Sequence, residues 1–391
     1  MKTVAQKTAA LDPCAGDRLP YAGHLDDHTV MTRSGDLIQM IQVDGVAFET
    51  ADSETLNHMA AVRDVVMRGI ANSNLMLYCH VIRRQVTAEL SGAQPEGFVR
   101  DLDDAWQQQL RGRRLYINDI VLMLVRRPAQ GKIGFFDRLT KWGNGQPNSA
   151  ERLAEQAREL RDLDAARTNL LSALTRYGPR LLSRYQGTSG MCSEPLEILS
   201  AMYNGEMQPV LEPTGDAGHY LPYKRISFGL DALELKGASA NTSRFGAIVS
   251  IKDYPAYTAP GMLDNLLRLP HELTMTESFA FIDRQIADER IGLALRRLRA
   301  ASDETTTLRQ SLLGAKDDLT GGAAAYGEHH LTVHVRAMTL AALDAAVADV
   351  QASLADIGAV AVREDLNLES AFWGQFPGNA DYIARKALVS T

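Results

Sequence analysis

VREDLNLESAFWGQFPGN, residues 362–379, is the stretch around which the predicted fold of this chain is organised. A predicted apolar strand at 359–362 is followed by charged residues. A short amphipathic turn comes next and carries Leu366, Leu368, Phe372 and Trp373. Pro377 then removes a backbone donor, and the Gly-Asn pair after it favours a turn. We therefore predict an aromatic anchor that marks a boundary, with only residues 381–391 beyond it.

Working back from that anchor, strand-like and helix-like patterns alternate along the chain. In the second half we expect strands at 245–251, 272–281, 328–336 and 359–362, and helices at 260–269, 283–314 and 339–356. In the first half we expect a hairpin of 28–32 with 36–43, strands at 75–82 and 116–125, a helix capped by Asp52 or Ser53, a polar helix at 96–110, and a long helix at 150–185 that Pro179 kinks or splits.

This rhythm predicts an α+β fold of two successive strand-helix layers, for which a ferredoxin-like topology is one option. The layers are joined by the long helix and a Gly/Pro-rich segment. The expected organisation is a flexible lead at 1–20, a first layer at 21–185 that includes a segment of changed character at 128–150, a connecting segment at 186–243, a second layer at 244–380, and a tail at 381–391.

The composition is that of a globular protein of more than one domain's length. The chain has 391 residues, 45% hydrophobic and 23% charged, and its net charge is 41 − 48 = −7. The acidic balance disfavours nucleic acid or anionic lipid as a partner of the whole surface. Three scattered cysteines without C-x-x-C spacing favour a reducing compartment. We find no signal-peptide pattern and no uncharged apolar run near the ~18 residues of a membrane span, so any membrane contact is expected to be peripheral.

Motifs for catalysis and for cofactor or metal binding are absent from the sequence. No G-x-x-x-x-G-K-[ST] occurs, and the Gly-rich run at 321–327 precedes a strand, not a helix. His271-Glu272 fails the H-E-x-x-H pattern because position 275 is Met. On a strand, His330 and His334 lie about 13 Å apart, too far for one ion. We therefore predict no catalytic, cofactor-binding or metal-binding residue in this chain.

Two positive features remain, each with a plainer alternative. Arg83-Arg84 and Arg126-Arg127 follow two buried strands, so four guanidinium groups line one sheet edge if those strands are parallel neighbours; the alternative is a solvated rim. The segment 132–142 alternates cations with aromatic anchors, which suits a membrane interface or a partner groove; the alternative is a loop folded onto its own domain. Its candidate docking residues are Lys132, Phe135, Phe136, Leu139 and Trp142.

Short sequence blocks then fall in the order found in one known family. They are Leu19-Pro20-Tyr21, His24-Leu25-Asp26-Asp27-His28, Gly35-Asp36-Leu37, residues 44–52, residues 80–84, Asn118-Asp119, Arg127-Pro128, Gly134-Phe135-Phe136, Arg176-Tyr177-Gly178, Pro195-Leu196-Glu197, Tyr254-Pro255, residues 327–331, Arg363-Glu364-Asp365 and Phe372-Trp373. Over nearly its whole length, the chain resembles the N-terminal region of the CagE/TrbE/VirB-type ATPases of type IV secretion and conjugation.

The resemblance implies a role in a larger machine. Members of that family are ATPases on the cytoplasmic face of the bacterial inner membrane, and they help power pilus biogenesis and substrate transfer. Their ATP and Mg sites lie in a C-terminal domain that these residues do not contain, so we expect the chain to be inactive alone. The implied partners are inner-membrane subunits, other secretion ATPases and further copies, typically in hexamers, with peripheral membrane contact and no direct nucleic acid.

Within that resemblance, the opening stretch is predicted to be a hinge toward the motor domain, formed by Phe372, Trp373, Pro377 and Gly378. Residues 381–391 would then be a linker and the least packed part of the chain after the lead. The alternative function is a nucleotide- or nucleic-acid-binding module that acts through the arginine-rich sheet edge.

Overall fold

The computed structural model describes residues 14–46, 51–87, 97–128, 149–239, 242–255, 257–300 and 306–391. Its strands are β1 (Tyr21–His24), β2 (Thr29–Thr32), β3 (Leu37–Val43), β4 (Leu75–Val86), β5 (Leu115–Arg126), β6 (Arg180–Leu181), β7 (Arg184–Gly187), β8 (Gly190–Ser193), β9 (Arg225–Phe228), β10 (Leu233–Lys236), β11 (Arg244–Asp253), β12 (Glu272–Phe281), β13 (Tyr326–Ala337), β14 (Val360–Arg363) and β15 (Ala387–Ser390).

The helices are fewer and mostly cover the sheet. They are α2 (Ala15–Arg18), α3 (Ser53–Gly69), α4 (Phe98–Arg111), α6 (Ser149–Ala173), α7 (Glu194–Asn204), α8 (Ala217–Tyr220), α9 (Asp264–Arg268), α10 (Arg284–Ala300), α11 (Thr306–Gly321), α12 (Leu340–Asp356) and α13 (Leu368–Gly374). Several begin at side-chain caps, since Asp52 accepts from the Thr55 amide at 2.6 Å and Thr339 from the Ala342 amide at 3.2 Å.

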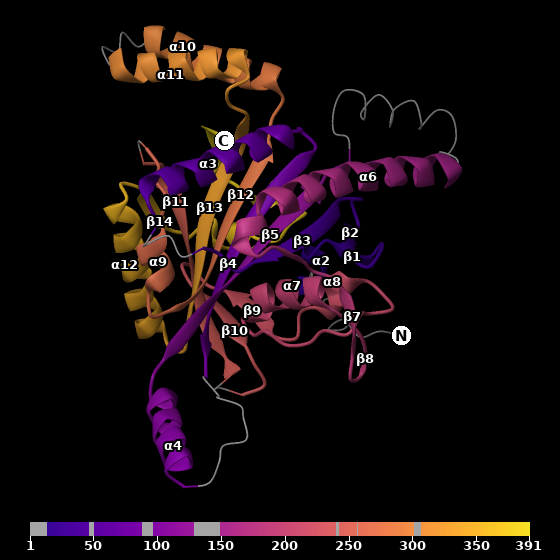
Figure 1. The fold of residues 1–391 in the computed structure, drawn as a ribbon, viewed down its shortest axis with the longest axis vertical. Coiled ribbons are helices and arrows are strands. Elements are labelled where there is room, and N and C mark those ends of the chain that lie inside the picture. The colour runs from indigo at the N-terminus through magenta and orange to yellow at the C-terminus, as the bar shows by residue number, and fades with distance from the viewer. Residues whose placement is uncertain are drawn as a thin grey trace, which may run out of the picture.

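One 13-stranded sheet runs through the molecule (Figure 1). Its main path is β1-β2-β3-β5-β4-β12-β13-β11-β10-β9, and β6, β14 and β15 pair with β3, β11 and β13. These pairings are antiparallel. The predicted α+β class is therefore confirmed, whereas nothing in the strand order establishes a ferredoxin-like topology. The two halves of the chain are joined within the sheet, because β4 pairs with β12 from Arg83–Leu273 to Met76–Ala280.

Alternation along the strands divides the core between the two faces of the sheet. On one face, Leu37, Ile41 and Leu124 pack with α6, and Val333 and Val335 pack with α12. On the other face, α7 and α13 cover a cluster that includes the side chains Met40, Tyr78, Val121, Met123, Tyr203, Phe372, Trp373 and Phe376. Residues from both halves of the chain thus share one core.

The segment at 186–243, expected as a connector, contains much more structure than that. It holds β8, α7, α8, β9 and β10, together with part of β7, and nine residues of α7 are buried. Ser193 caps α7 by accepting from the Leu196 amide at 3.2 Å, and Gly205 ends it with a left-handed φ of 78°. The Gly and Pro content therefore marks helix ends and short turns around a buried helix.

The predicted helix at 283–314 appears as two helices, α10 and α11, which run side by side at one end of the molecule (Figure 1). An ion pair of 3.3 Å between Lys316 and Asp288 connects them. The predicted helix at 150–185 ends at Ala173, and a 3₁₀ turn at Thr175–Tyr177 leads to Gly178, whose φ is 60°. A left-handed glycine followed by Pro179 stops the helix before its predicted end.

The tail is better packed than the sequence predicted. Residues Ala387–Ser390 form β15, which pairs with β13 from Tyr326–Ser390 to His329–Ala387. Ile383 is buried, and the Thr391 amide donates to the Ala325 carbonyl at 2.9 Å. The prediction of a poorly packed tail was wrong, because β13 extends beyond β11 and leaves an edge that the tail fills.

Candidate docking surface and adjoining cleft

The clearest unpartnered surface lies on α4, at the end of an arm formed by β4 and β5. These two strands pair along their whole length, from Leu75–Arg126 to Val86–Leu115. The pairing of β4 with β12 stops at Arg83, so the far ends of β4 and β5 continue without a neighbouring strand. Helix α4 sits at the tip and stands away from the body (Figure 1). We call β4, α4 and β5 beyond Arg83 the arm.

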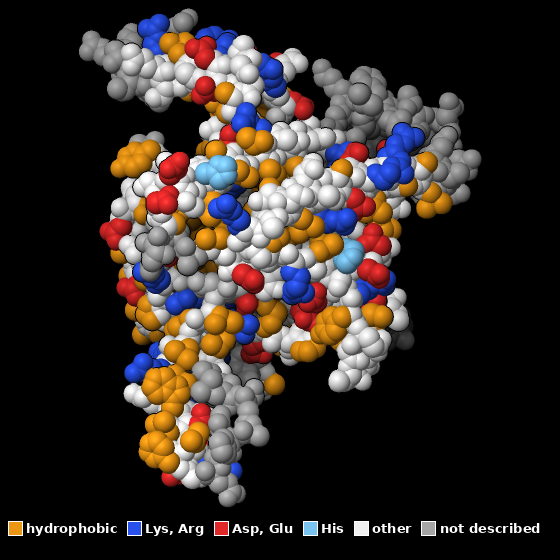
Figure 2. Space-filling model, in the orientation of Figure 1, with side chains coloured by type: hydrophobic (Ala, Val, Ile, Leu, Met, Phe, Trp, Pro, Cys, Tyr) orange, Lys and Arg blue, Asp and Glu red, His pale blue; other side chains and the backbone are white. Residues whose placement is uncertain are grey.

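Helix α4 exposes an apolar stripe, although its sequence led us to expect a polar helix. Phe98, Leu102 and Trp106 follow each other at four-residue spacing and are 79%, 59% and 55% exposed. None of the residues of α4 is buried. Hydrophobic side chains gather at this end of the molecule in Figure 2. The spacing was visible in the sequence, and a stripe of this kind normally has a covering partner.

The charges on α4 indicate what kind of partner suits it. At 100° per residue, Asp101 and Asp103 border the apolar stripe on its two sides, and Arg100 and Arg111 fall on the opposite face. Helices that lie in a membrane interface carry mainly Lys and Arg on their polar face, whereas α4 has three aspartates and two arginines. A stripe bordered by carboxylates is better suited to a protein groove that offers cations.

A cleft of about 720 Å³ opens at the foot of the arm. Its walls come from the ends of β4, β5, β12 and β13 and from the start of α12, and include the apolar side chains of Val86, Pro270, Met338, Ala342 and Ala345. Arg114, Arg244 and Arg336 also line it, and Glu272 is the carboxylate among its lining residues. Arg244 pairs with Glu272 at 3.9 Å. The cleft is thus apolar and cationic in an acidic chain.

Arg336 is the buried cation of this cleft. Its side chain is 4% exposed, and one Nη donates to Thr274 Oγ1 at 2.9 Å. Its Nε is buried without a hydrogen-bond partner in the described part of the chain. Desolvation lowers the pKa of Arg336, although the nearby Glu272 acts in the opposite direction. The positive charge of Arg336 is therefore only partly compensated by its neighbours.

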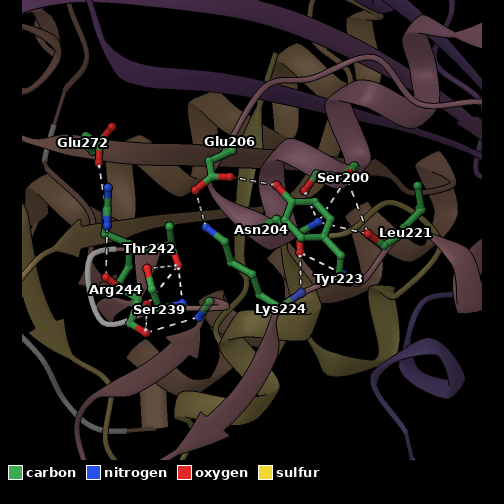
Figure 3. Close-up of polar contacts among 12 residues, drawn as sticks. Ser200, Asn204, Glu206, Leu221, Tyr223, Lys224, Ser239, Thr242, Arg244 and Glu272 are labelled. Atoms are coloured by element: carbon green, nitrogen blue, oxygen red, sulfur yellow. Dashed lines mark hydrogen bonds and ion pairs between the residues drawn. The ribbon is translucent and has the colours of Figure 1, made fainter.

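A polar network fixes the elements behind the cleft (Figure 3). Buried Asn204 donates to the carbonyl oxygens of Ser200 and Leu221, both at 3.0 Å, and accepts from the amides of Tyr223 and Lys224, both at 3.1 Å. Lys224 in turn donates to Glu206 at 2.6 Å. This network ties the C-terminal end of α7 to the chain that leads into β9. Arg336 lies against the same helix end, at Gly205.

The four arginines predicted to line one edge do not come together. Because β4 and β5 are antiparallel, Arg83 is opposite Asn118 and Arg126 is opposite Leu75, at the two ends of the pair. Arg83 donates to Leu269 O at 2.7 Å and stacks on Tyr116, and Arg84 pairs with Asp119 at 2.6 Å. At the other end, Arg126 pairs with Asp162 and Arg127 donates to Ser73 O. The assumption of parallel strands was wrong.

The predicted hinge residues lie in the core around α13. Phe372 and Trp373 are buried and contact Tyr203 and Phe228, and Pro377 is buried beside them. Gly378 has a φ of 93°, and a Cβ there would meet Pro20 at 2.9 Å. Their role as a hinge stays a prediction. The predicted docking segment, with Lys132, Phe135, Phe136, Leu139 and Trp142, lies outside the described residues.

A second large cleft, of about 760 Å³, lies beneath α3. Glu277 lines it together with Met67, Leu77 and Phe279, and burial raises the pKa of the Glu277 carboxyl. No described residue forms a hydrogen bond or an ion pair with that carboxylate. Sequence reasoning missed this residue, because alternation along β12 does not show that α3 leaves the strand partly uncovered.

The histidines considered as metal ligands lie apart. His329 contacts the Tyr254 hydroxyl at 2.9 Å, whereas His330 and His334 are buried on the opposite face of β13. Within the described ranges, the one group that could hold a metal ion is the exposed set of Cys14, Asp17 and His219. None of the helices in the described parts of the chain is long and apolar enough to cross a membrane.

Comparison with known proteins gives the class of this protein. Residues 180–385 match the model of the CagE, TrbE, VirB family, components of the type IV transporter system, and residues 28–133 match the N-terminal domain of the type IV secretion system ATPase VirB4/TrbE. The first match covers more than half of the chain. The chain therefore belongs to the CagE, TrbE, VirB family and corresponds to the N-terminal region of a VirB4/TrbE-type protein.

The similar proteins of known name are type IV secretion system proteins. It is 32% identical over 379 residues to the type IV secretion system protein virB4 of Bartonella henselae, covering 96% of this chain and 47% of the relative. It is 31% identical to the protein virB4 of Agrobacterium fabrum, over 95% of this chain and 46% of the relative. With PtlC, a type IV secretion system protein of Bordetella pertussis, the identity is 27%, over 95% and 45%. The chain spans about half the length of these relatives.

Proposed function

We propose that this chain is the docking and assembly region of a type IV secretion ATPase. In the complete protein, a C-terminal domain would bind ATP and Mg and hydrolyse ATP to help power pilus biogenesis and substrate translocation. The described region would attach that motor to inner-membrane subunits and to other ATPases on the cytoplasmic face of the membrane. Family membership supports this role, and so does the lack of a phosphate-binding loop in the sequence.

The observation that carries the proposal is the exposed apolar stripe of α4. It stands on an arm away from the body and uses Phe98, Leu102 and Trp106, the residue types that anchor a helix in a protein groove. A stripe this apolar costs solubility unless a partner covers it. The described residues of the body do not cover it.

Recruitment to the membrane complex tests this role. Leu102→Asp with Trp106→Asp should reduce the amount of protein that co-purifies with the membrane complex by at least about tenfold, since two buried anchors are lost. The matched control, Gln108→Asp, alters an exposed position of the same helix outside the stripe. Circular dichroism and the thermal midpoint should be unchanged in both variants. Normal recruitment of the double variant would contradict the proposal for α4.

The segment 132–142 is a second proposed contact, carried by its sequence alone. Deleting it should abolish recruitment and leave the folded body intact, because aromatic anchors alternate with cations there. Unchanged recruitment after the deletion would remove this segment from the docking surface. The alternative function, nucleotide or nucleic-acid binding at an arginine edge, has lost its geometric basis with the separation of Arg83–Arg84 from Arg126–Arg127.

A further inference from the structure

We propose that the cleft at the foot of the arm receives the carboxylate-bordered apolar stripe of α4 from a second copy of this chain. The inference rests on the proposed function, in which α4 is an assembly surface, and it names the occupant of one interface. In this arrangement each copy inserts its helix into the cleft of the other, which is the self-complementary contact of a two-fold dimer.

The lining residues of the cleft carry more positive than negative charge, with three arginines and one glutamate. Glu272 lies near both Arg244 and Arg336, Glu206 also acts on Arg244, and Arg114 adds a third cation at the same opening. The C-terminal end of α7 lies against Arg336 and offsets part of its charge. The unpaired Nε of Arg336 shows that this compensation is incomplete. A carboxylate entering the cleft would supply the missing charge through charge-assisted hydrogen bonds.

Helix α4 carries both the apolar side chains and the carboxylates that suit this cleft. Its apolar stripe would meet Val86, Met338 and Ala342 on the cleft walls, and Asp101 and Asp103 at the borders of the stripe would face the arginines. The arginines of α4 lie on its other side and would stay in solvent. The cleft beneath α3 is a poorer match, because it is lined by two carboxylates, Asp64 and Glu277, and by one arginine, Arg63.

The geometry points to exchange between copies. The strand ends of the arm form one wall of the cleft, and α4 continues from them and extends away from the body (Figure 1). None of its residues is among those that line the cleft of its own chain. A second copy can present the helix from outside while its own cleft accepts the first copy's helix.

Sedimentation of the purified chain, over a range of protein and salt concentrations, tests the charge match. Asp101→Arg with Asp103→Arg should weaken self-association at least about tenfold, and so should Arg114→Glu. Mixing these two variants should restore the association, because each chain then offers the charge that the other lacks. Asp104→Arg on the far side of α4 and Arg297→Glu on α10 serve as matched controls and should associate normally.

A disulfide test distinguishes exchange from folding back within one chain. Leu102→Cys and Met338→Cys are placed in separate chains, both with Cys14→Ser to remove an exposed thiol. Oxidation of the mixture should give a covalent dimer that neither variant gives alone. A chain carrying both cysteines that closes only on itself would overturn the proposal, and so would a native chain that is monomeric at every concentration. If recruitment still requires α4 in that case, the proposed docking function survives.

Discussion

At the scale of single residues, Asn204 is a position where one buried side chain satisfies four backbone groups. Asn204→Ala would leave the Leu221 carbonyl and the amides of Tyr223 and Lys224 without this partner. We expect the free energy of unfolding to fall by about 3 kcal/mol, since several buried groups lose hydrogen bonds together. Urea unfolding measures the change, and Asn169→Ala, on an exposed position of α6, should have little effect.

The buried histidines predict how stability depends on pH. Burial lowers the pKa of His80 to about 4 and that of His330 to about 3, and His80 Nε2 donates to the Gln375 carbonyl at 2.9 Å. In the unfolded chain a histidine titrates near 6.5. Between about pH 6.5 and pH 4, the unfolded state therefore binds protons that the folded state does not, and stability rises with pH across this window.

Replacing one of these histidines should reduce that dependence. His80→Gln can still donate to the Gln375 carbonyl but cannot titrate. We expect the slope of the unfolding free energy against pH, between about pH 4.5 and pH 6, to decrease by roughly 1.4 kcal/mol per pH unit. His58→Gln on the exposed surface of α3 is the control. An unchanged slope would show that His80 is not held neutral in the folded state.

At the scale of elements, α13 is the helix on which much of the shared core depends. Phe372 is fully buried, with ring centroids 5.0 Å from Trp373, 5.6 Å from Phe228 and 5.7 Å from Phe376. We expect Phe372→Ala to reduce the free energy of unfolding by about 4 kcal/mol, because it leaves a cavity under the sheet. Leu366→Ala, at a position that is 93% exposed, should change it by less than about 0.5 kcal/mol. Denaturant unfolding of both variants decides whether α13 holds the core in this way.

Helix α4, unlike α13, has its apolar side exposed. The same spacing of large apolar residues that buries α13 leaves α4 exposed, because the arm carries it beyond the reach of the body. An amphipathic pattern in a sequence thus predicts that a helix will cover something, and does not say whether the partner belongs to the same chain.

At the scale of the whole molecule, the continuous sheet predicts that the two halves unfold together. The β4–β12 pairing joins them over eight residue pairs, from Leu273–Arg83 to Ala280–Met76. Separating the halves would leave two long unpaired edges that face a shared core. We therefore expect the slowest-exchanging amides of β5 and β11, one from each half, to report the same opening free energy.

Hydrogen exchange followed by mass spectrometry measures both strands in one sample. Exposed amides of α4, on the arm, should exchange from a much less stable local unit and serve as the internal comparison. If β11 opened at a clearly lower free energy than β5, the halves would behave as separate domains in spite of their shared sheet.

The sequence by itself determined many of the local elements and the family. Alternation and helical spacing placed the strands at 245–251 and 272–281 and the helix at 339–356, because these periods are properties of neighbouring residues. Asp52 at the start of α3 was readable for the same reason. The missing phosphate-binding loop was also visible, and the ordered blocks of residues led to the family that the comparisons confirmed.

Only the tertiary structure decided where those elements meet. The antiparallel pairing of β4 with β5 separated the arginine pairs, and the pairing of β13 with β15 packed a tail that was expected to be poorly packed. The walls of the cleft at Arg336 come from strands and a helix that are far apart in the chain. Helix α4 is exposed because β4 and β5 extend beyond the strand that pairs with β4. Strand partners and directions depend on long-range contacts, and those contacts leave no period in the local sequence.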